Sequence, residues 1–172
     1  MKKGKFLILV WIIALITVSI DQVIKGIVSS FIGINNSVKI INGFFSITNV
    51  HNYGAAWSML WEKRGYIIAV TVIALIFVLI LLFRESSYKK YKTIYYGLLI
   101  GGIIGNLIDR IFLGFVVDYL DFTFFGYDYP IFNLSDAFIV ISILMICIEC
   151  FMPHKKEPEE FLQEVEVLDF DE

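Results

Sequence analysis

Two aspartates in the second half of the chain have the placement of a reacting pair. Asp118 follows Val116-Val117, and Asp136 lies in the first turn of the last apolar segment. Close carboxylates cannot both ionise cheaply, so they share a proton and titrate as a pair. The ionised member can deprotonate a water molecule while the protonated member polarises a carbonyl group. Such a pair predicts hydrolytic chemistry, although the helix dipole alone also favours an acid at the position of Asp136.

The composition indicates where such a pair would have to work. The chain has 172 residues, of which 58% are hydrophobic and 18% charged, and its mean hydropathy is +0.77. Soluble domains are only about 45–50% apolar, so lipid must cover the excess. The net charge of −3 provides no basic surface for nucleic acid, and two cysteines cannot make a disulfide framework. These properties indicate an integral membrane protein of one domain.

Four apolar segments are long enough, with their flanks, to cross a bilayer, which takes about 20 helical residues. They are Phe6–Ile20, continuing as a helix to about Val28, then Tyr66–Phe83, Ile94–Ile108 and Leu134–Met152. The sequence therefore predicts an all-α membrane protein with four transmembrane helices in a single domain, residues 1–152. Residues 153–172 are polar and acidic, and they are predicted to be a disordered cytoplasmic tail.

The basic residues predict the orientation. They gather before the first helix, between the second and third, and after the fourth: Lys2, Lys3, Lys5, Arg84, Lys89, Lys90, Lys92, Lys155 and Lys156. The 109–133 connection holds only Arg110. The positive-inside rule then places both termini in the cytoplasm and the 29–65 and 109–133 connections outside.

The residues of the two outer connections predict a structure for each. Val38–Ile41 and Phe44–Val50 flank Asn42-Gly43, a dipeptide that favours a type I′ hairpin turn, so we expect a small extracytoplasmic β-sheet. The 119–132 stretch is dense in Phe and Tyr, which settle at the headgroup level. It is predicted to be an interfacial aromatic loop.

Several polar residues fall at the outer ends of the predicted helices or in the outer loops. Besides the two aspartates, they are Asp21, Lys25, Asn52, Asn106, Asp109, Arg110 and Asn133. A charge within the bilayer costs at least about 2.5–3.5 kcal/mol, so their gathering at one depth predicts a polar site. The alternative is that each residue simply marks a helix end.

Some of these residues leave their role open. Arg110 lies one helical turn after Asn106 and could hold a substrate carbonyl or a lipid headgroup, or merely neutralise a nearby aspartate. Asp21 and Lys25 form an i,i+4 pair that we interpret as structural. Asn52 could bind a peptide backbone or cap its own turn. The row of Gly97, Gly101 and Gly105 predicts a close helix-packing face.

Two other function classes match single features of the sequence. Cys147-Ile-Glu-Cys150 has the spacing of a thiol oxidoreductase, but it falls at the predicted cytoplasmic end without a second cysteine pair, so we expect two buried small side chains. A transporter with a carboxylate proton relay predicts acids strung along the spans, whose middles carry none. No metal-binding motif is present, and no metal or cofactor is expected.

Five blocks in this order resemble those of the bacterial lipoprotein signal peptidase (signal peptidase II) family. They are Asp21–Lys25, Asn52–Trp57, Gly101–Arg110, Val116–Tyr119 and Phe132–Asp136. Each block alone is weak, and the five together are specific. The resemblance covers roughly residues 5–150.

The resemblance implies a bacterial inner-membrane aspartic endopeptidase with its active site near the outer face. Such an enzyme cuts diacylglyceryl-modified prolipoproteins before the lipidated cysteine and is inhibited by the cyclic peptide globomycin. Asp118 and Asp136 would be catalytic. Asn52, Asn106, Arg110 and Asn133 would position the substrate or shape the site, and Asp21, Lys25, Asp109, Gly101 and Gly105 would support it. Ser135 departs from the family's usual Ala, and Tyr119 from the common Phe. A monomer is expected.

Overall fold

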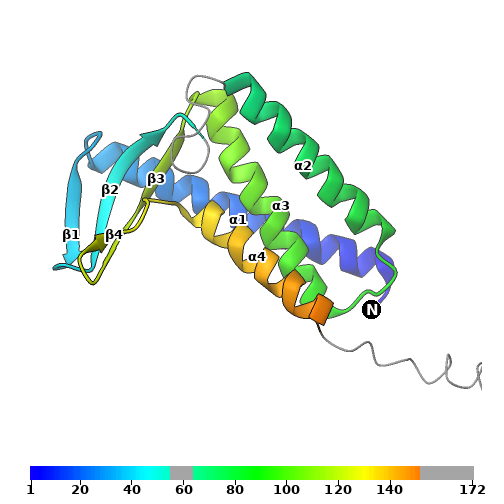
Figure 1. Cartoon of the computed structure of the whole chain (residues 1–172). Helices are drawn as coiled ribbons and strands as arrows, with labels where there is room; N and C mark the ends of the chain where they lie inside the picture. Colours follow the sequence, from blue (N-terminus) through cyan, green and yellow to red (C-terminus); the bar gives the residue numbers. More distant parts are fainter. Residues whose placement is uncertain (55–63, 152–172) are drawn as a thin grey trace, which may run out of the picture.

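The computed structural model describes residues 1–54 and 64–151 (Figure 1). In these stretches the elements follow the order α1 (Lys3–Phe31), β1 (Ser37–Ile41), β2 (Phe45–Asn52), α2 (Arg64–Arg84), α3 (Lys90–Phe112), β3 (Val116–Phe124), β4 (Tyr127–Asp128) and α4 (Leu134–Phe151). All four helices are long and apolar enough to cross a membrane, which confirms the predicted fold class. The predicted tail, Met152 and residues 55–57 of the second block lie outside the described residues.

The helices are longer than the apolar segments that predicted them. α1 continues to Phe31, beyond the expected end near Val28, and α3 begins at Lys90 instead of Ile94 and ends at Phe112. Hydropathy marks only the part of a helix that hydrocarbon surrounds, whereas Lys, Tyr, Asp and Arg are all tolerated in helical turns beyond it. Polar candidates on α1 and α3 therefore lie inside the helices: Asp21, Lys25, Asn106, Asp109 and Arg110.

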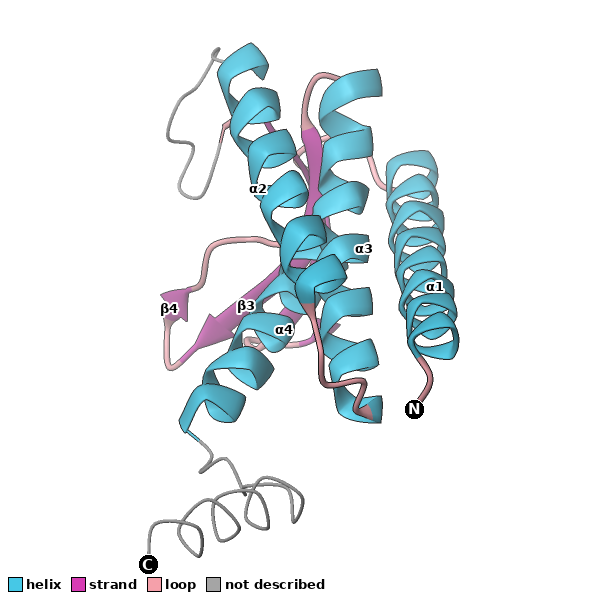
Figure 2. Ribbon diagram, turned by 90° about the vertical axis from the view of Figure 1, so that its right-hand side faces the viewer, coloured by secondary structure: helices cyan, strands magenta, loops and turns pink. Residues whose placement is uncertain are grey.

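The third helix, α3, is the centre of the bundle, with α1 on one side and α2 and α4 on the other (Figure 2). Ile100 on α3 is fully buried, whereas Leu15 on α1 and Ile73 on α2 are 67% and 66% exposed. The exposed apolar faces of the outer helices are the surfaces that lipid must cover.

The α1–α3 interface depends on the predicted glycine row. A Cβ atom at Gly101 would lie 2.7 Å from Thr17 Cβ and 2.9 Å from the Ala14 carbonyl oxygen. One at Gly97 would lie 2.6 Å from Ile13 Cβ, and one at Gly105 would meet Asp21 Oδ2 at 2.8 Å. The close approach of the two backbones thus requires small residues along this face.

The antiparallel sheet has the strand order β1-β2-β3-β4 and lies at the end of the bundle away from the N-terminus (Figure 1). The expected hairpin is present, but its turn is not type I′, because Gly43 has φ +71° while Asn42 is not among the positive-φ residues. The larger difference concerns residues 116–124, which form strand β3 where the sequence suggested the start of a loop. Asp118 therefore sits on a strand, opposite Val50.

Strand β3 also fixes the start of α4. The Leu120 N–H donates to the Phe132 carbonyl at 2.7 Å, and the Phe132 N–H donates back to the Leu120 carbonyl at 3.2 Å. Val117 and Tyr119 pack with Val28, so the inner face of the sheet rests on the last turns of α1. These contacts bring the segments that carry Asp118 and Asp136 side by side.

Replacing Gly101 by alanine tests the packing face. The added methyl group overlaps Thr17 and the Ala14 carbonyl, and overpacking of this kind costs about 1–3 kcal/mol. Gly26→Ala is the matched control, because no atom lies within 4 Å of its added Cβ atom and alanine favours a helix by about 1 kcal/mol. In thermal unfolding in one detergent, Gly101→Ala should unfold at a lower temperature and Gly26→Ala should not. A Gly101→Ala protein as stable as the control would contradict the close packing.

Candidate active site

One fully buried residue, Asn133, binds both candidate catalytic carboxylates, that of Asp118 through its side chain and that of Asp136 through its backbone N–H. Its Nδ2 donates to Asp118 Oδ1 at 2.6 Å, and its Oδ1 accepts the Asp136 N–H at 3.0 Å. The Asn133 N–H donates to Asp136 Oδ2 at 3.2 Å. The last two bonds make a reciprocal cap on the first turn of α4, so a local capping pattern also sets the place of Asp136. Asn133 thereby fixes the two carboxylates relative to each other.

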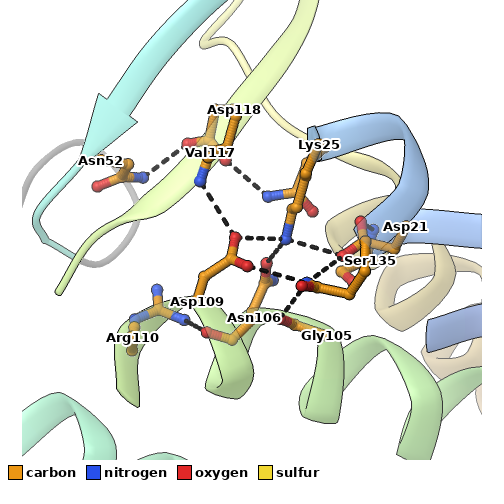
Figure 3. Close-up of polar contacts among 12 residues, drawn as sticks. Asp21, Lys25, Asn52, Gly105, Asn106, Asp109, Arg110, Val117, Asp118 and Ser135 are labelled. Atoms are coloured by element: carbon orange, nitrogen blue, oxygen red, sulfur yellow. Dashed lines mark hydrogen bonds and ion pairs between the residues drawn. The ribbon is translucent and has the colours of Figure 1, made fainter. Parts of the chain in front are cut away.

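The other oxygen of each carboxylate accepts a hydrogen bond from a further asparagine, a different one for each aspartate. Asn52 Nδ2 donates to Asp118 Oδ2 at 2.8 Å (Figure 3), and Asn106 Nδ2 donates to Asp136 Oδ1 at 2.7 Å. Asn52 also caps its own turn, because its Oδ1 accepts the Gly54 N–H at 3.0 Å. These neutral donors orient the carboxylates without neutralising them, which leaves the pair free to share a proton.

Asp118 is 3% exposed, and its environment shifts its ionisation. Burial, with a further contribution from the charge of Asp136, raises the pKa of Asp118 to about 7, against the opposing effect of the bonds from Asn52 and Asn133. Near neutral pH, Asp118 can therefore hold a proton while a neighbouring carboxylate is ionised.

A buried ammonium group, that of Lys25, lies next to the carboxylate pair. Lys25 Nζ lies 2.8 Å from Asp21 Oδ2, 2.9 Å from Asp109 Oδ2 and 2.9 Å from Asn106 Oδ1 (Figure 3). All four side chains are at most 5% exposed. The contacts join α1 to α3 at the depth of the carboxylate pair.

The two aspartates of this cluster also bind backbone groups of other elements. Asp21 Oδ1 accepts the Ser135 N–H of α4 at 3.0 Å, and Asp109 Oδ2 accepts the Val117 N–H of β3 at 3.2 Å. The neighbours of both catalytic candidates are thus anchored to the Lys25 cluster.

Arg110 has a different environment. Its Nη1 donates to the Asn106 carbonyl at 3.3 Å and its Nη2 to the Gly54 carbonyl at 3.4 Å, and it forms no ion pair within the described residues. Lys25 already neutralises Asp109, so Arg110 is not needed for that role. Its guanidinium group lines the cavity beside the two aspartates.

Two residues of this region were missed in the sequence. Gln22 Nε2 donates to Asp109 Oδ1 at 2.9 Å and to the Gly105 carbonyl at 3.1 Å. Arg64 donates to the Arg110 and Ile111 carbonyls at 2.8 and 2.7 Å and so caps the C-terminus of α3. The position of Gln22 beside Asp21 was the only sequence signal for either, because the contacts join distant segments.

The two departures from the family pattern behave differently. Ser135 Oγ is buried against Gly105 and Asp21 and has no hydrogen-bond partner within the described residues, so it does not bind Asp136. The Tyr119 hydroxyl accepts the Leu134 N–H at 3.3 Å and thereby satisfies a donor at the start of α4. A phenylalanine could not make that contact.

The carboxylate pair faces a cavity of about 530 Å³ with two kinds of lining. Asn52, Arg110, Asp118 and Asp136 form its polar part. Apolar residues that include Phe132 and the α4 residues Ile139, Val140 and Ile141 form the rest. Val140 and Ile141 are also 54% and 46% exposed on the outside of α4, so the apolar wall continues into the surface that faces lipid. The cavity suits a substrate with both peptide and hydrocarbon parts.

The two cysteines lie apart from the carboxylate pair. Cys147 and Cys150 are free and exposed, so the prediction of burial was wrong, because no other described element covers their side of α4. Cys147 lies 11 residues, about 16 Å of helix, from Asp136.

Comparison with known proteins gives the family. The model of the family described as Signal peptidase (SPase) II matches residues 13–152. The chain belongs to the signal peptidase II family. This confirms the resemblance inferred from the five blocks and makes the protein a membrane-embedded peptidase.

Individual relatives agree with the family match. The lipoprotein signal peptidase of Staphylococcus haemolyticus (strain JCSC1435) is 38% identical over 148 residues, 86% of this chain and 94% of that protein. The one from Staphylococcus aureus (strain JH9) is 37% identical over 150 residues, 86% and 92% of the two chains. A solved structure described as a bacterial membrane enzyme superposes with a TM-score of 0.79 at 33% identity, covering 90% of this chain and 94% of the other.

The Lys25 cluster predicts a large loss of stability when its cation is removed. Lys25→Met leaves the carboxylates of Asp21 and Asp109 buried without a positive partner, which costs about 3–5 kcal/mol. Lys39→Met removes the same charge from the exposed strand β1 and should change stability by less than about 0.5 kcal/mol. Denaturant unfolding of both purified variants compares them. Equal stability of the two variants would show that Lys25 does not hold the bundle together.

Proposed function

We propose that this member of the signal peptidase II family removes the signal peptide from diacylglyceryl-modified prolipoproteins, cutting before the lipidated cysteine, with Asp118 and Asp136 activating the attacking water. The observation that carries the proposal is the binding of both carboxylates by Asn133, through its side-chain amide and its backbone N–H, at the polar part of a cavity with an apolar wall. The printed names of the relatives, lipoprotein signal peptidases, support the same substrate class.

The proton positions follow from the surroundings of each carboxylate. Because burial raises the pKa of Asp118 to about 7, Asp118 is the member that carries the proton near neutral pH. Asp136 lies in the first turn of α4, where the helix dipole favours a negative charge. Asp136 then takes a proton from water as the water attacks the scissile carbonyl carbon, and Asp118 donates its hydrogen bond to the developing oxyanion. Collapse of the intermediate breaks the C–N bond as a carboxyl proton passes to the leaving amine.

The remaining polar residues of the cavity bind the substrate or hold the carboxylates in place. Arg110, whose Nη atoms reach only backbone carbonyls within the described residues, is placed to bind a carbonyl of the substrate backbone. Asn52, Asn106 and Asn133 hold the carboxylates in position. The acyl chains of the substrate stay in lipid along the apolar α4 wall, so the lipidated residue need not leave the membrane. Globomycin-type cyclic peptides would compete for this cavity.

The same proposal includes orientation and oligomeric state. The carboxylate pair lies toward the sheet, and the basic residues Lys2, Lys3, Lys5 and Lys89–Lys92 lie at the other end of the bundle (Figure 1). The positive-inside rule then puts both termini in the cytoplasm and the active site near the outer face. Both aspartates and the described cavity lining come from one chain, so a monomer suffices.

Single replacement of either aspartate tests the pair. Asp118→Asn and Asp136→Asn should each lower kcat by about 10²–10⁴-fold, the range that general acid–base groups supply. The assay uses purified full-length protein and a prolipoprotein bearing a diacylglyceryl cysteine, with the released peptide identified by mass. Asp128→Asn, on the exposed strand β4, controls for loss of a carboxyl group, and the double variant Cys147→Ser, Cys150→Ser tests the thiol alternative. Near-normal cleavage by either aspartate variant would refute the pair.

The pH profile tests the shared proton. With the pKa of Asp118 at about 7, the singly protonated pair is lost as pH rises, so kcat/KM should fall about tenfold per pH unit above about pH 7. It should also fall in acid as both carboxyls become protonated. The comparison is with Asp128→Asn, which should keep the profile of the unaltered protein. A flat profile from about pH 5 to 9 would contradict a carboxyl pair.

A further inference from the structure

A second cavity lies at the opposite end of the bundle from the carboxylates, where the N-terminus meets the α2–α3 link (Figure 1). It measures about 650 Å³, and its lining includes four lysines and two tyrosines: Lys2, Lys5, Lys89, Lys90, Tyr88 and Tyr91. No carboxylate is among its lining residues. The cavity is therefore a concentrated positive site with aromatic walls.

The charges of these lysines are not compensated within residues 1–54 and 64–151. Among the described acids of this end of the bundle, Glu85 and Glu149 are engaged elsewhere, since Lys92 lies 2.8 Å from Glu85 Oε2 and 3.0 Å from Glu149 Oε1. None of the four cavity lysines forms an ion pair within the described part of the chain. Mutual repulsion of like charges at this spot would be relieved by a bound anion.

Two helix N-termini add to the positive potential. α1 begins at Lys3 after Lys2, and α3 begins at Lys90 after Lys89. Neither preceding lysine caps its helix with a side-chain hydrogen bond, and neither first turn contains an acid. Helices ordinarily place Ser, Asp or Glu at these positions to satisfy free N–H groups and the dipole. The local sequence lowers the stability of the two helix N-termini and favours the binding of an anion there.

The residues around the cavity suit the binding of a lipid headgroup. Its Tyr88 ring packs on the buried Phe6 ring with centroids 5.4 Å apart, which joins the α2–α3 link to α1. One to two turns further along α1, Ile8 and Ile12 are 61% and 46% exposed and offer an apolar surface to acyl chains. Basic pockets at the ends of transmembrane helices are suited to acidic lipid headgroups.

We propose that this cavity binds the phosphate group of an anionic phospholipid, with Lys5 and Lys90 as principal charge partners and the acyl chains along the exposed face of α1. The site is separate from the carboxylate cavity and does not depend on the proposed reaction. It would anchor the cytoplasmic end of α1 against α3 through a bound lipid.

The test compares two double variants that lose the same charge at the same end of the bundle. Lys5→Gln with Lys90→Gln alters the cavity, whereas Lys3→Gln with Arg84→Gln removes exposed charges outside its lining. Full-length protein in detergent is titrated with phosphatidylglycerol or with phosphatidylcholine of the same chains, and bound lipid is counted by native mass spectrometry. The unaltered protein should prefer phosphatidylglycerol, and the cavity variant should bind it about tenfold more weakly. The control variant should keep the preference.

Several results would overturn the proposal. They are the absence of a preference in the unaltered protein, an equal loss in both variants, and retention of the preference in the cavity variant. Glycerol phosphate, which carries the headgroup chemistry without acyl chains, separates the two possible sources of phosphate. At equal concentration it should not displace phosphatidylglycerol, and displacement would show a site for free phosphate instead of lipid. Equal thermal unfolding temperatures of the two variants establish that both are folded.

Discussion

The arrangement of the helices in this membrane peptidase depends on the contacts of one buried ammonium group, that of Lys25. It faces Asp21 on its own helix and Asp109 and Asn106 on α3, all within 2.9 Å. Burying an ion pair costs several kcal/mol of desolvation per ion, so the cluster is not an efficient source of stability. What it provides is a single register in which the buried charges of Lys25, Asp21 and Asp109 all have partners. A slip of α1 along the glycine row of α3 would break the contacts of Lys25 with Asp109 and Asn106 at once.

The same ammonium group orients the carboxylate pair through a continuous series of bonds. Because Lys25 can only donate, it takes the oxygen of Asn106 and leaves the Asn106 amide nitrogen for Asp136. Asp136 is bound reciprocally to Asn133, whose own amide nitrogen reaches Asp118. Each asparagine thus has a defined orientation set by its neighbour. Polar groups that would be costly in isolation become a rigid support for two carboxylates.

Much of this could be predicted from the sequence, and the limits have physical causes. Hydropathy located all four helices, and the five blocks gave the family, because both are local features. The capping of α4 by Asn133 and Asp136 is also local, although only the role of Asp136 at a helix start was inferred. Strand β3 was missed because its pairing with β2 joins residues more than 60 positions apart, such as Val50 and Asp118. The contacts of Gln22 and Arg64 were missed for the same reason.

The central claim is that Asp118 and Asp136 act as one coupled carboxyl pair. Infrared difference spectra of the full-length protein, recorded across pH, follow the protonated carboxyl group directly. The unaltered protein should show a protonated carboxyl band that disappears as pH rises through about 7, because burial and the charge of Asp136 raise the pKa of Asp118. Asp118→Asn should remove this band, and Asp136→Asn should move its titration to lower pH by removing the neighbouring charge. A band that is unchanged in both variants would contradict the coupled pair.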